Sequence, residues 1–147
     1  MKVLFIFGTR PEAIKMAPII KKIKLHPDDF NVKICITAQH REMLDQVLEF
    51  FEIKANYDLD LMEPNQDLFD ISINCLAGLK AVFEDSQPDL IFVQGDTTTA
   101  FIGALAGYYL KVKVAHLEAG LRSNDKYSPY PEEMNRILAG HIADYHF

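Results

Sequence analysis

The fold is first indicated by the stretch KVLFIFGTRPEAIK, residues 2–15. Its first six residues are almost wholly apolar, and a glycine turn follows them at Gly8. A continuous apolar run is typical of a parallel strand that is covered on both faces. Thr9, with Glu12 three residues later and Pro11 between them, is the capping-box pattern that begins a helix. The stretch therefore predicts a strand, a tight turn and a helix.

Apolar runs like this one recur along the chain and alternate with helical patterns. The runs expected to form buried strands are Val3–Phe7, Val32–Thr37, Leu90–Gln94 and Val112–His116. The segments expected to form helices are about Arg10–Leu25, Arg41–Phe51, Asp67–Asp85, Thr97–Leu110 and Pro131–His141. This alternation predicts an α/β fold of the Rossmann-like, doubly wound type, with a parallel sheet and right-handed crossovers.

Two weaker signals extend the expected sheet. Tyr57, Leu59 and Leu61 alternate with polar residues, which is typical of an edge strand. Residues 143–147 resemble the start of a sixth strand, and a domain rarely ends midway through a buried strand. We therefore expect residues 1–147 to be the N-terminal domain of a longer protein.

Composition excludes several classes of function. The chain has 147 residues, the size of one domain, and a formal net charge of −6. Nucleic acids and anionic membranes attract clustered cations, so this charge argues against both as partners. No apolar run approaches the roughly 20 residues that span a bilayer. Cys35 and Cys75 lack metal-type spacing, and we expect buried free thiols in a cytoplasmic protein.

The carboxyl ends of the expected strands carry polar residues. In a doubly wound sheet of strand order 3-2-1-4-5-6, ligands bind beyond the carboxyl ends, where the first and fourth strands meet. The strand ends concerned are Gly8–Arg10, Gln39–His40, Gln94–Thr97 and His116–Glu118. Since all four ends meet at one edge of the sheet, we expect a site there.

The first of these turns differs from a dinucleotide-binding loop because the usual three glycines are missing. The capping box occupies helix amides, and Pro11 has no amide donor. We expect Arg10 and Lys15 to replace the missing amides, since a guanidinium binds phosphate bidentately and the helix dipole adds attraction. The alternative is a well-capped helix with no ligand.

Asp96 and Glu118 are candidate acid–base groups at two neighbouring strand ends. Asp96 follows Gly95, and its alternative role is to cap the next helix, although the threonines that follow are equally suited to capping. Glu118 lies just beyond the fifth strand, and its alternative is a solvated loop position. His116 and Glu118 do not predict a metal site, because no third ligand has suitable spacing.

The last expected helix begins with a third candidate carboxylate, Glu132. Helical spacing places Glu132, Asn135 and Arg136 on one face. The other face takes Met134, Ile137 and Leu138. A surface salt bridge between Glu132 and Arg136 is the alternative to a functional role. Three carboxylates beside a phosphate-type site favour acid–base chemistry, with one group as acid and another as base.

Five motifs then identify a family resemblance over the whole chain. They are Gly8–Glu12, Gln39–Arg41, Gly95–Thr99, Glu118–Arg122 and Tyr127–Glu133. In this order they resemble the N-terminal domain of the non-hydrolysing UDP-N-acetylglucosamine 2-epimerases. The resemblance implies a two-domain architecture of the GT-B type, in which two Rossmann-like domains face a cleft. It also implies a bacterial, cytoplasmic isomerase that serves the synthesis of cell-envelope polysaccharides and assembles as a homodimer through its N-terminal domain.

The family resemblance also implies a reaction. UDP-N-acetylglucosamine and UDP-N-acetylmannosamine interconvert by elimination of UDP to a 2-acetamidoglucal and re-addition with the other configuration at C2, without metal or nicotinamide cofactor. The acid–base residues carried over are Asp96, Glu118 and Glu132. The residues carried over for contact with the nucleotide sugar and its diphosphate are Arg10, Lys15 and Arg136. Gln39 and His40 match a region that binds a second, regulatory molecule of UDP-N-acetylglucosamine in some members.

Two departures limit what the resemblance carries over. Glu42 and Asn65 stand where some regulated members have Gln and Arg, which argues against a regulatory site in this chain. The C-terminal domain, which provides most uridine contacts in relatives, is absent from these residues, so we expect little or no turnover by this chain alone. A hydrolysing epimerase and a non-catalytic module for nucleotide-sugar binding or dimerisation are the alternatives.

Overall fold

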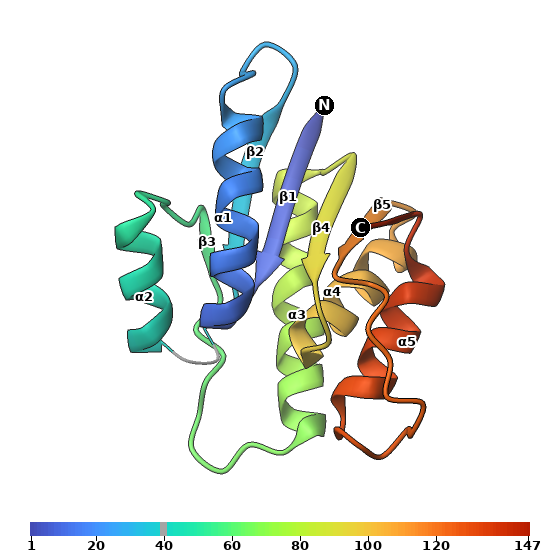
Figure 1. Ribbon diagram of the computed structural model, residues 1–147. Coiled ribbons are helices and arrows are strands. Elements are labelled where there is room, and N and C mark those ends of the chain that lie inside the picture. Colours follow the sequence, from blue (N-terminus) through green and yellow to red (C-terminus); the bar gives the residue numbers. More distant parts are fainter. Residues whose placement is uncertain (39–40) are drawn as a thin grey trace.

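A six-stranded parallel sheet forms the centre of the protein in the computed structural model, which describes residues 1–38 and 41–147 (Figure 1). Its order is β3-β2-β1-β4-β5-β6, so β1 and β4 are neighbours although a long stretch of sequence separates them. The strands are β1 (Lys2–Phe7), β2 (Asn31–Ile36), β3 (Tyr57–Asp58), β4 (Leu90–Gln94), β5 (Lys113–Leu117) and β6 (Tyr145–His146). This order confirms the doubly wound sheet predicted from the sequence.

Five helices in the described part of the chain cover the two faces of this sheet. They are α1 (Arg10–Lys24), α2 (Arg41–Phe50), α3 (Leu68–Ser86), α4 (Thr98–Tyr109) and α5 (Glu132–Ile142). Residues of α1 and α2 pack on one face, and residues of α3, α4 and α5 pack on the other (Figure 1). The protein therefore has a helix–sheet–helix sandwich with two hydrophobic cores.

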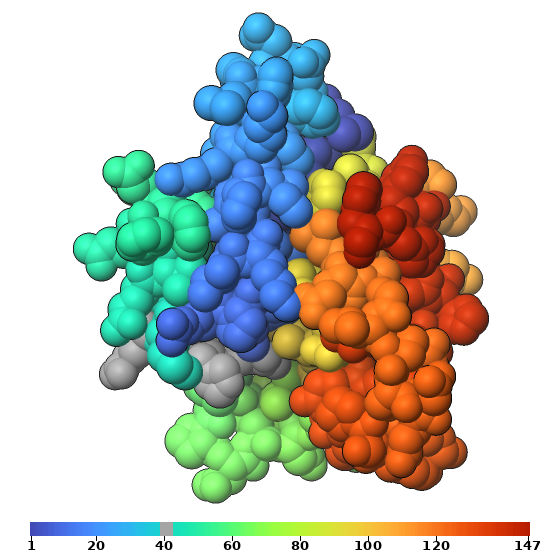
Figure 2. All heavy atoms as spheres, in the orientation of Figure 1, coloured from blue at the N-terminus to red at the C-terminus, as the bar shows by residue number. Residues whose placement is uncertain are grey.

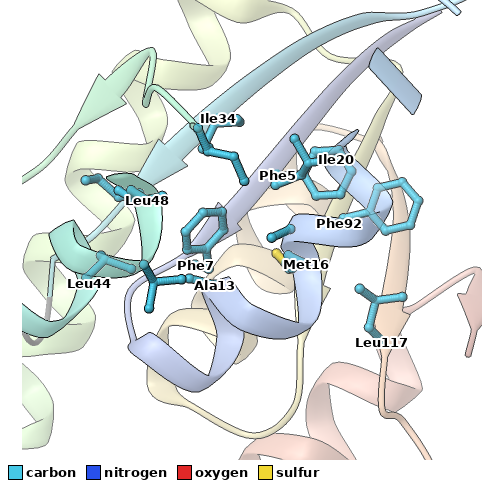
Figure 3. Packing of buried hydrophobic residues seen from close by; sticks show 14 of the residues in the cluster. Phe5, Phe7, Ala13, Met16, Ile20, Ile34, Leu44, Leu48, Phe92 and Leu117 are labelled. Atoms are coloured by element: carbon cyan, nitrogen blue, oxygen red, sulfur yellow. The ribbon is translucent and has the colours of Figure 1, made fainter. Parts of the chain in front are cut away.

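The side chains of β1 divide between these two cores. Phe5 and Phe7 pack against α1, where Met16 and Ile20 are fully buried, as Figure 3 shows. Phe5 also stacks on Phe92 of β4, with 4.7 Å between the ring centroids. The intervening residues of β1 face the other core. Burial on both faces explains why this strand is continuously apolar rather than alternating.

Helix α4 packs close to the sheet because it contains glycines at the contact. A Cβ atom added at Gly103 would lie 3.0 Å from a methyl carbon of Val93, and one at Gly107 would lie 2.8 Å from Ile91. Such distances leave no room for a side chain. The close approach sets the height of α4 above β4, and the turn that leads into this helix carries part of the site described below.

The boundaries of most elements agree with expectation within a residue or two. The predicted edge strand is shorter than the alternating pattern indicates, because its ladder with β2 is limited to Tyr57 and Asp58. Beyond it, the amides of Leu59 and Leu61 still donate to the carbonyls of residues 36 and 37. The sixth strand expected near the end of the chain is present and pairs with β5. In the described part of the chain, no helix is long and apolar enough to cross a membrane.

Candidate functional site

The site lies at the carboxyl edge of the sheet, where the β1–α1 and β4–α4 turns are adjacent. Gly95 makes the second turn possible because its φ of 69° lies in the left-handed region. Its amide donates to the Leu117 carbonyl at 2.8 Å, and its carbonyl lies 2.7 Å from His116 Nε2. Since a carbonyl only accepts, Nε2 of His116 carries the proton. The turn that presents Asp96 is thus held on both sides by β5.

Asp96 does not cap the helix that follows it. Thr97 is the N-cap of α4 and accepts from the Ala100 amide at 3.0 Å, so the alternative role of Asp96 as helix cap is wrong. The Asp96 carboxylate instead pairs with Arg136, with 2.6 Å between Oδ2 and Nη2. Its backbone carbonyl accepts from Asn135 Nδ2 at 2.9 Å. Two residues of α5 therefore hold the Asp96 turn.

Arg136 is the central cation of the site, and only 9% of it is exposed. Beyond its bond to Asp96, its Nη1 donates to the Leu121 carbonyl at 3.1 Å. Its Nη2 lies 4.0 Å from Oε1 of Glu118, so one guanidinium faces two of the predicted carboxylates. Its Nε is buried and has no hydrogen-bond partner among the described residues. The alternative of a surface salt bridge with Glu132 is wrong, because Arg136 is buried against the Asp96 turn.

Glu118 joins the opposite side of the site to α1. Its φ of 59° lies in the left-handed region, which is unusual for a residue with a Cβ atom. The carboxylate forms an ion pair with Lys15 of α1 and accepts from Gln94 Nε2. Figure 2 shows the corresponding seam, where blue residues of α1 meet orange residues that follow β5. Glu118 is therefore a fixed part of the site and not a solvated loop residue.

The first turn of α5 presents two adjacent glutamates in different states. Oε2 of Glu132 is buried and has no hydrogen-bond partner in the described part of the chain. Glu133 accepts from the amides of Ser123 and Asn124 at 2.9 and 3.1 Å and from Arg122 Nε at 2.9 Å. These bonds, led by that of the Ser123 amide, lower the pKa of Glu133. Glu133 fastens the loop that follows β5, and Glu132 retains acceptor capacity.

The buried face of α5 is polar, which the sequence pattern does not indicate. Its buried residues are Glu133, Asn135, Arg136 and Ala139. The apolar face has Leu138, which is 37% exposed. Helical spacing groups Asn135 and Arg136 correctly, but it does not tell which group faces the sheet.

Glu12 is a site residue that the sequence pattern assigns only to helix capping. It is 1% exposed and accepts from the Thr9 amide at 2.7 Å, as the capping box predicts. It also accepts from the Gly8 amide at 3.0 Å and from Thr97 Oγ1 at 2.7 Å. Burial raises the pKa of this carboxyl group, and the hydrogen bonds act in the opposite direction. No local pattern reveals the bond to Thr97, which joins residues on different turns.

The two cations of α1 lie at the open side of the site. Arg10 is exposed, and Lys15 is about half exposed in its pair with Glu118. Both line a concavity of 570 Å³, together with Pro11, Ile14 and Met43.

Gln39 and His40, predicted as a regulatory region, lie outside the described residues. Among the side chains that the structure describes, no group of three His, Cys, Asp or Glu would hold a metal ion.

The structure thus brings four of the predicted residues into direct contact: Asp96 with Arg136, and Glu118 with Lys15, with Arg136 also near Glu118. Neither of these ion pairs includes Arg10 or Glu132. The arrangement offers carboxylates for proton transfer, cations for an anionic group, and two buried polar atoms, Glu132 Oε2 and Arg136 Nε, that lack partners within the described chain.

The comparisons with known proteins agree on one family. The family model described as UDP-N-acetylglucosamine 2-epimerase matches residues 21–147. A protein of Yersinia pestis named UDP-N-acetylglucosamine 2-epimerase is 58% identical over 147 residues, which are all of this chain and 39% of that protein. The chain therefore spans well under half the length of such relatives.

Solved structures give the same result. The crystal structure of UDP-GlcNAc 2-epimerase from Neisseria meningitidis bound to UDP-GlcNAc is 56% identical and superposes with a TM-score of 0.96, over 100% of this chain and 39% of that one. The Methanocaldococcus jannaschii UDP-GlcNAc 2-epimerase in complex with UDP-GlcNAc and UDP is 37% identical, with a TM-score of 0.92 over 100% and 40% of the two chains.

Proposed function

This chain belongs to the UDP-N-acetylglucosamine 2-epimerase family, and we propose that it is the N-terminal domain of an enzyme that interconverts UDP-N-acetylglucosamine and UDP-N-acetylmannosamine. A second, C-terminal domain completes the cleft in this proposal. Its support is that the chain covers 39% of the Neisseria meningitidis structure, which is bound to UDP-GlcNAc. Residues 1–147 contribute the acid–base groups and part of the diphosphate site.

One observation of the site carries the proposal most strongly. The guanidinium of Arg136 faces Asp96 at 2.6 Å and Glu118 at 4.0 Å, while its own Nε and the Glu132 Oε2 atom are buried without partners among the described residues. A buried polar group without a hydrogen bond destabilises the folded state. A ligand with both acceptor and donor groups, such as a sugar diphosphate, would satisfy both atoms.

The residues fit an elimination and re-addition at the sugar. One carboxylate among Asp96, Glu118 and Glu132 takes the C2 proton, the C1–O bond breaks, and its electron pair leaves with the diphosphate oxygen. A C1–C2 double bond remains. The diphosphate oxygen then attacks C1, and a protonated carboxyl group returns a proton to C2 on the opposite face. Both steps are general acid–base catalysis.

The cations act on the charge of the leaving group. Arg10 and Lys15 lie on α1, and Arg136 lies on α5. Positive groups held at the developing negative charge lower the barrier for its departure. Lys15 and Arg136 are paired with carboxylates in this structure, so binding of a diphosphate exchanges an internal partner for an external one.

The test supplies the second half of the cleft. Residues 1–147 are fused to the C-terminal part of the Neisseria meningitidis relative, and UDP-N-acetylglucosamine is added. We expect UDP-N-acetylmannosamine to form. A folded fusion that binds UDP but forms no epimer would contradict the proposal, and release of free N-acetylmannosamine would indicate a hydrolysing enzyme.

The proposal includes a homodimer formed through α3 and α4. A concavity of 440 Å³ between these helices is lined by Ile73, Leu76, Ala77, Lys80, Ala106, Tyr109 and Leu110. Ile73 and Tyr109 are 64% and 61% exposed. Exposed apolar patches of this kind mark interaction surfaces. Sedimentation should show a dimer of the fusion and a monomer after Tyr109→Glu; a wild-type monomer at micromolar concentration would contradict this part.

A cytoplasmic location is also part of the proposal. Cys35 and Cys75 are both buried as free thiols, a state that reducing compartments maintain. Burial raises the pKa of the Cys75 thiol to about 12, so this side chain stays protonated and unreactive in the folded protein.

A further inference from the structure

We propose that Glu12 is a positioning residue, which fixes the β1–α1 turn with its phosphate-binding cations against the β4–α4 turn with Asp96. The inference rests on the proposed function for its meaning in catalysis. Its structural basis is the hydrogen bond from Thr97 Oγ1 to Glu12 Oε1, of 2.7 Å, between residues 85 positions apart.

Helix capping explains the hydrogen bonds of only one of the two oxygens of the Glu12 carboxylate. Oε2 accepts the amides of Gly8 and Thr9 at 3.0 and 2.7 Å, which serves the start of α1. Oε1 is not needed there, and it receives the hydroxyl of a residue on another turn. The carboxylate therefore has one oxygen on each of the two turns that meet at the switch point of the sheet.

Thr97 uses both functions of its hydroxyl group. The oxygen accepts the Ala100 amide at 3.0 Å and caps α4, and the proton is donated to Glu12. Asp96 directly precedes Thr97, so any shift of this hydroxyl moves the backbone that carries the Asp96 carboxylate. Arg10 and Lys15 lie on the same helix as Glu12. The hydrogen bond between Thr97 and Glu12 thus connects the helix that carries Arg10 and Lys15 to the turn that carries Asp96.

The environment makes this link a rigid one. Glu12 is 1% exposed, and the neighbouring Gly8 packs against the buried hydroxyls of Thr37 and Thr99, which lie 2.9 Å apart. A Cβ atom at Gly8 would lie 2.0 Å from Thr37 Oγ1, so the backbone of the turn has little room to shift. A carboxylate at a helix N-terminus is also stabilised by the helix dipole.

The test changes Thr97, because loss of the fully buried Glu12 side chain endangers folding. Thr97→Val keeps the shape but removes the bond to Glu12 together with the α4 cap. Thr97→Ser keeps both. Asp67→Ala is the matched control, because it removes the α3 cap, in which Asp67 accepts from the Phe69 and Asp70 amides, and leaves the two turns of the site unchanged. All are made in the fusion of residues 1–147 with the C-terminal part of the Neisseria meningitidis relative.

Two readouts decide the outcome. Thr97→Val should lower kcat by roughly 10- to 100-fold with little change in KM, because a misplaced acid–base group affects the transition state and not substrate binding. Hydrogen exchange at the amides of Gly8 and Thr9 should accelerate about 10-fold as the Glu12 anchor is lost. Thr97→Ser and Asp67→Ala should resemble the unsubstituted fusion in both readouts.

The two readouts also separate failure of this inference from failure of the proposed function. An unsubstituted fusion without turnover contradicts the proposed function, and the exchange measurement then decides the inference alone. Unchanged amide exchange in Thr97→Val overturns the positioning role. In an active fusion, a kcat of Thr97→Val equal to that of Asp67→Ala also overturns the positioning role.

Discussion

The two edges of the sheet both carry ion pairs, but they use them differently. At the amino edge, Lys113 pairs with Asp144 at 2.6 Å and Lys33 with Asp85 at 3.3 Å, and in these pairs Lys113 is 61% and Asp85 68% exposed. At the carboxyl edge, Asp96 pairs with Arg136 at the same 2.6 Å, but the arginine side chain is only 10% exposed. Ion pairs with similar distances therefore differ in how far their side chains are exposed to solvent.

The two edges also differ in their buried polar atoms without a hydrogen-bond partner. Among the described residues, the buried side-chain atoms without a hydrogen-bond partner are His116 Nδ1, Glu132 Oε2 and Arg136 Nε. All three belong to β5 or α5 on the side of the carboxyl edge. Exposed pairs exchange one set of polar contacts for another and contribute little, whereas buried groups without partners carry a cost that persists until a ligand binds. Under the proposed function, a ligand at the carboxyl edge provides partners for buried groups of Glu132 and Arg136, whereas each ion pair at the amino edge has a side chain that is more than half exposed.

The largest expected effect comes from removing a charge at the carboxyl edge. Asp96→Asn in the fusion with a C-terminal domain should lower kcat for epimer formation by about 10²- to 10⁴-fold, because an amide neither takes nor returns a proton. Product formation is followed by NMR. Folding should persist, since asparagine still accepts from Arg136. Activity within about tenfold of wild type would remove Asp96 from the acid–base group.

The next largest effect is a loss of stability at the carboxyl edge. Arg136→Gln leaves the Asp96 carboxylate without its cation in a partly buried place, and we expect a loss of about 2–3 kcal/mol in the free energy of unfolding. Urea denaturation measures it. A loss below about 0.5 kcal/mol would show that the site is as well solvated as the surface.

The pH dependence of stability should separate Glu133 from Glu12. Amide bonds lower the folded-state pKa of Glu133 below its ordinary 4.5, so its contribution is present above that value and is lost as pH falls through the folded pKa. Burial raises the folded-state pKa of Glu12 above 4.5, so its contribution is complete below that value and declines as pH rises through the folded pKa.

Two glutamine variants measure these opposite slopes. Glu133→Gln should flatten the decline of unfolding free energy on the acid side of pH 4.5, and Glu12→Gln should flatten the decline on the other side. Urea denaturation at pH values on both sides of 4.5 provides the curves. Slopes of the same sign for both residues would contradict the environments described here.

The smallest effect is expected at the amino edge. Lys113 is 61% exposed, so Lys113→Gln should change the free energy of unfolding by no more than about 0.5 kcal/mol and leave UDP affinity unchanged. Denaturation and calorimetric titration measure both. A UDP affinity of Lys113→Gln below that of the unsubstituted fusion would contradict the difference between the two edges.

The sequence predicts much of this arrangement because the signals are local or follow from the strand order. Apolar runs identify β1, β2, β4 and β5, and the switch-point rule brings Asp96 and Glu118 to one edge. The partner of Arg136 is 40 residues away and depends on how α5 is rotated against β4 and β5. Periodicity defines the faces of a helix without telling which one is buried when both contain polar residues.

The link between Glu12 and Thr97 could not be predicted for the same reason. The capping-box pattern gives Glu12 a role within its own helix, and nothing in the local sequence indicates a second partner for its other carboxylate oxygen. Only the adjacency of β1 and β4 brings the two turns within hydrogen-bond distance.

Proton transfer at C2 of a UDP-sugar by the carboxyl edge of this domain is the central claim. The most direct measurement is entry of deuterium at C2 when the fusion acts on UDP-N-acetylglucosamine in D2O. We predict deuterium in both epimers with the unsubstituted fusion, and a rate of incorporation about 10²- to 10⁴-fold lower with Asp96→Asn. Epimer formation without deuterium at C2, or equal incorporation by Asp96→Asn, would contradict it.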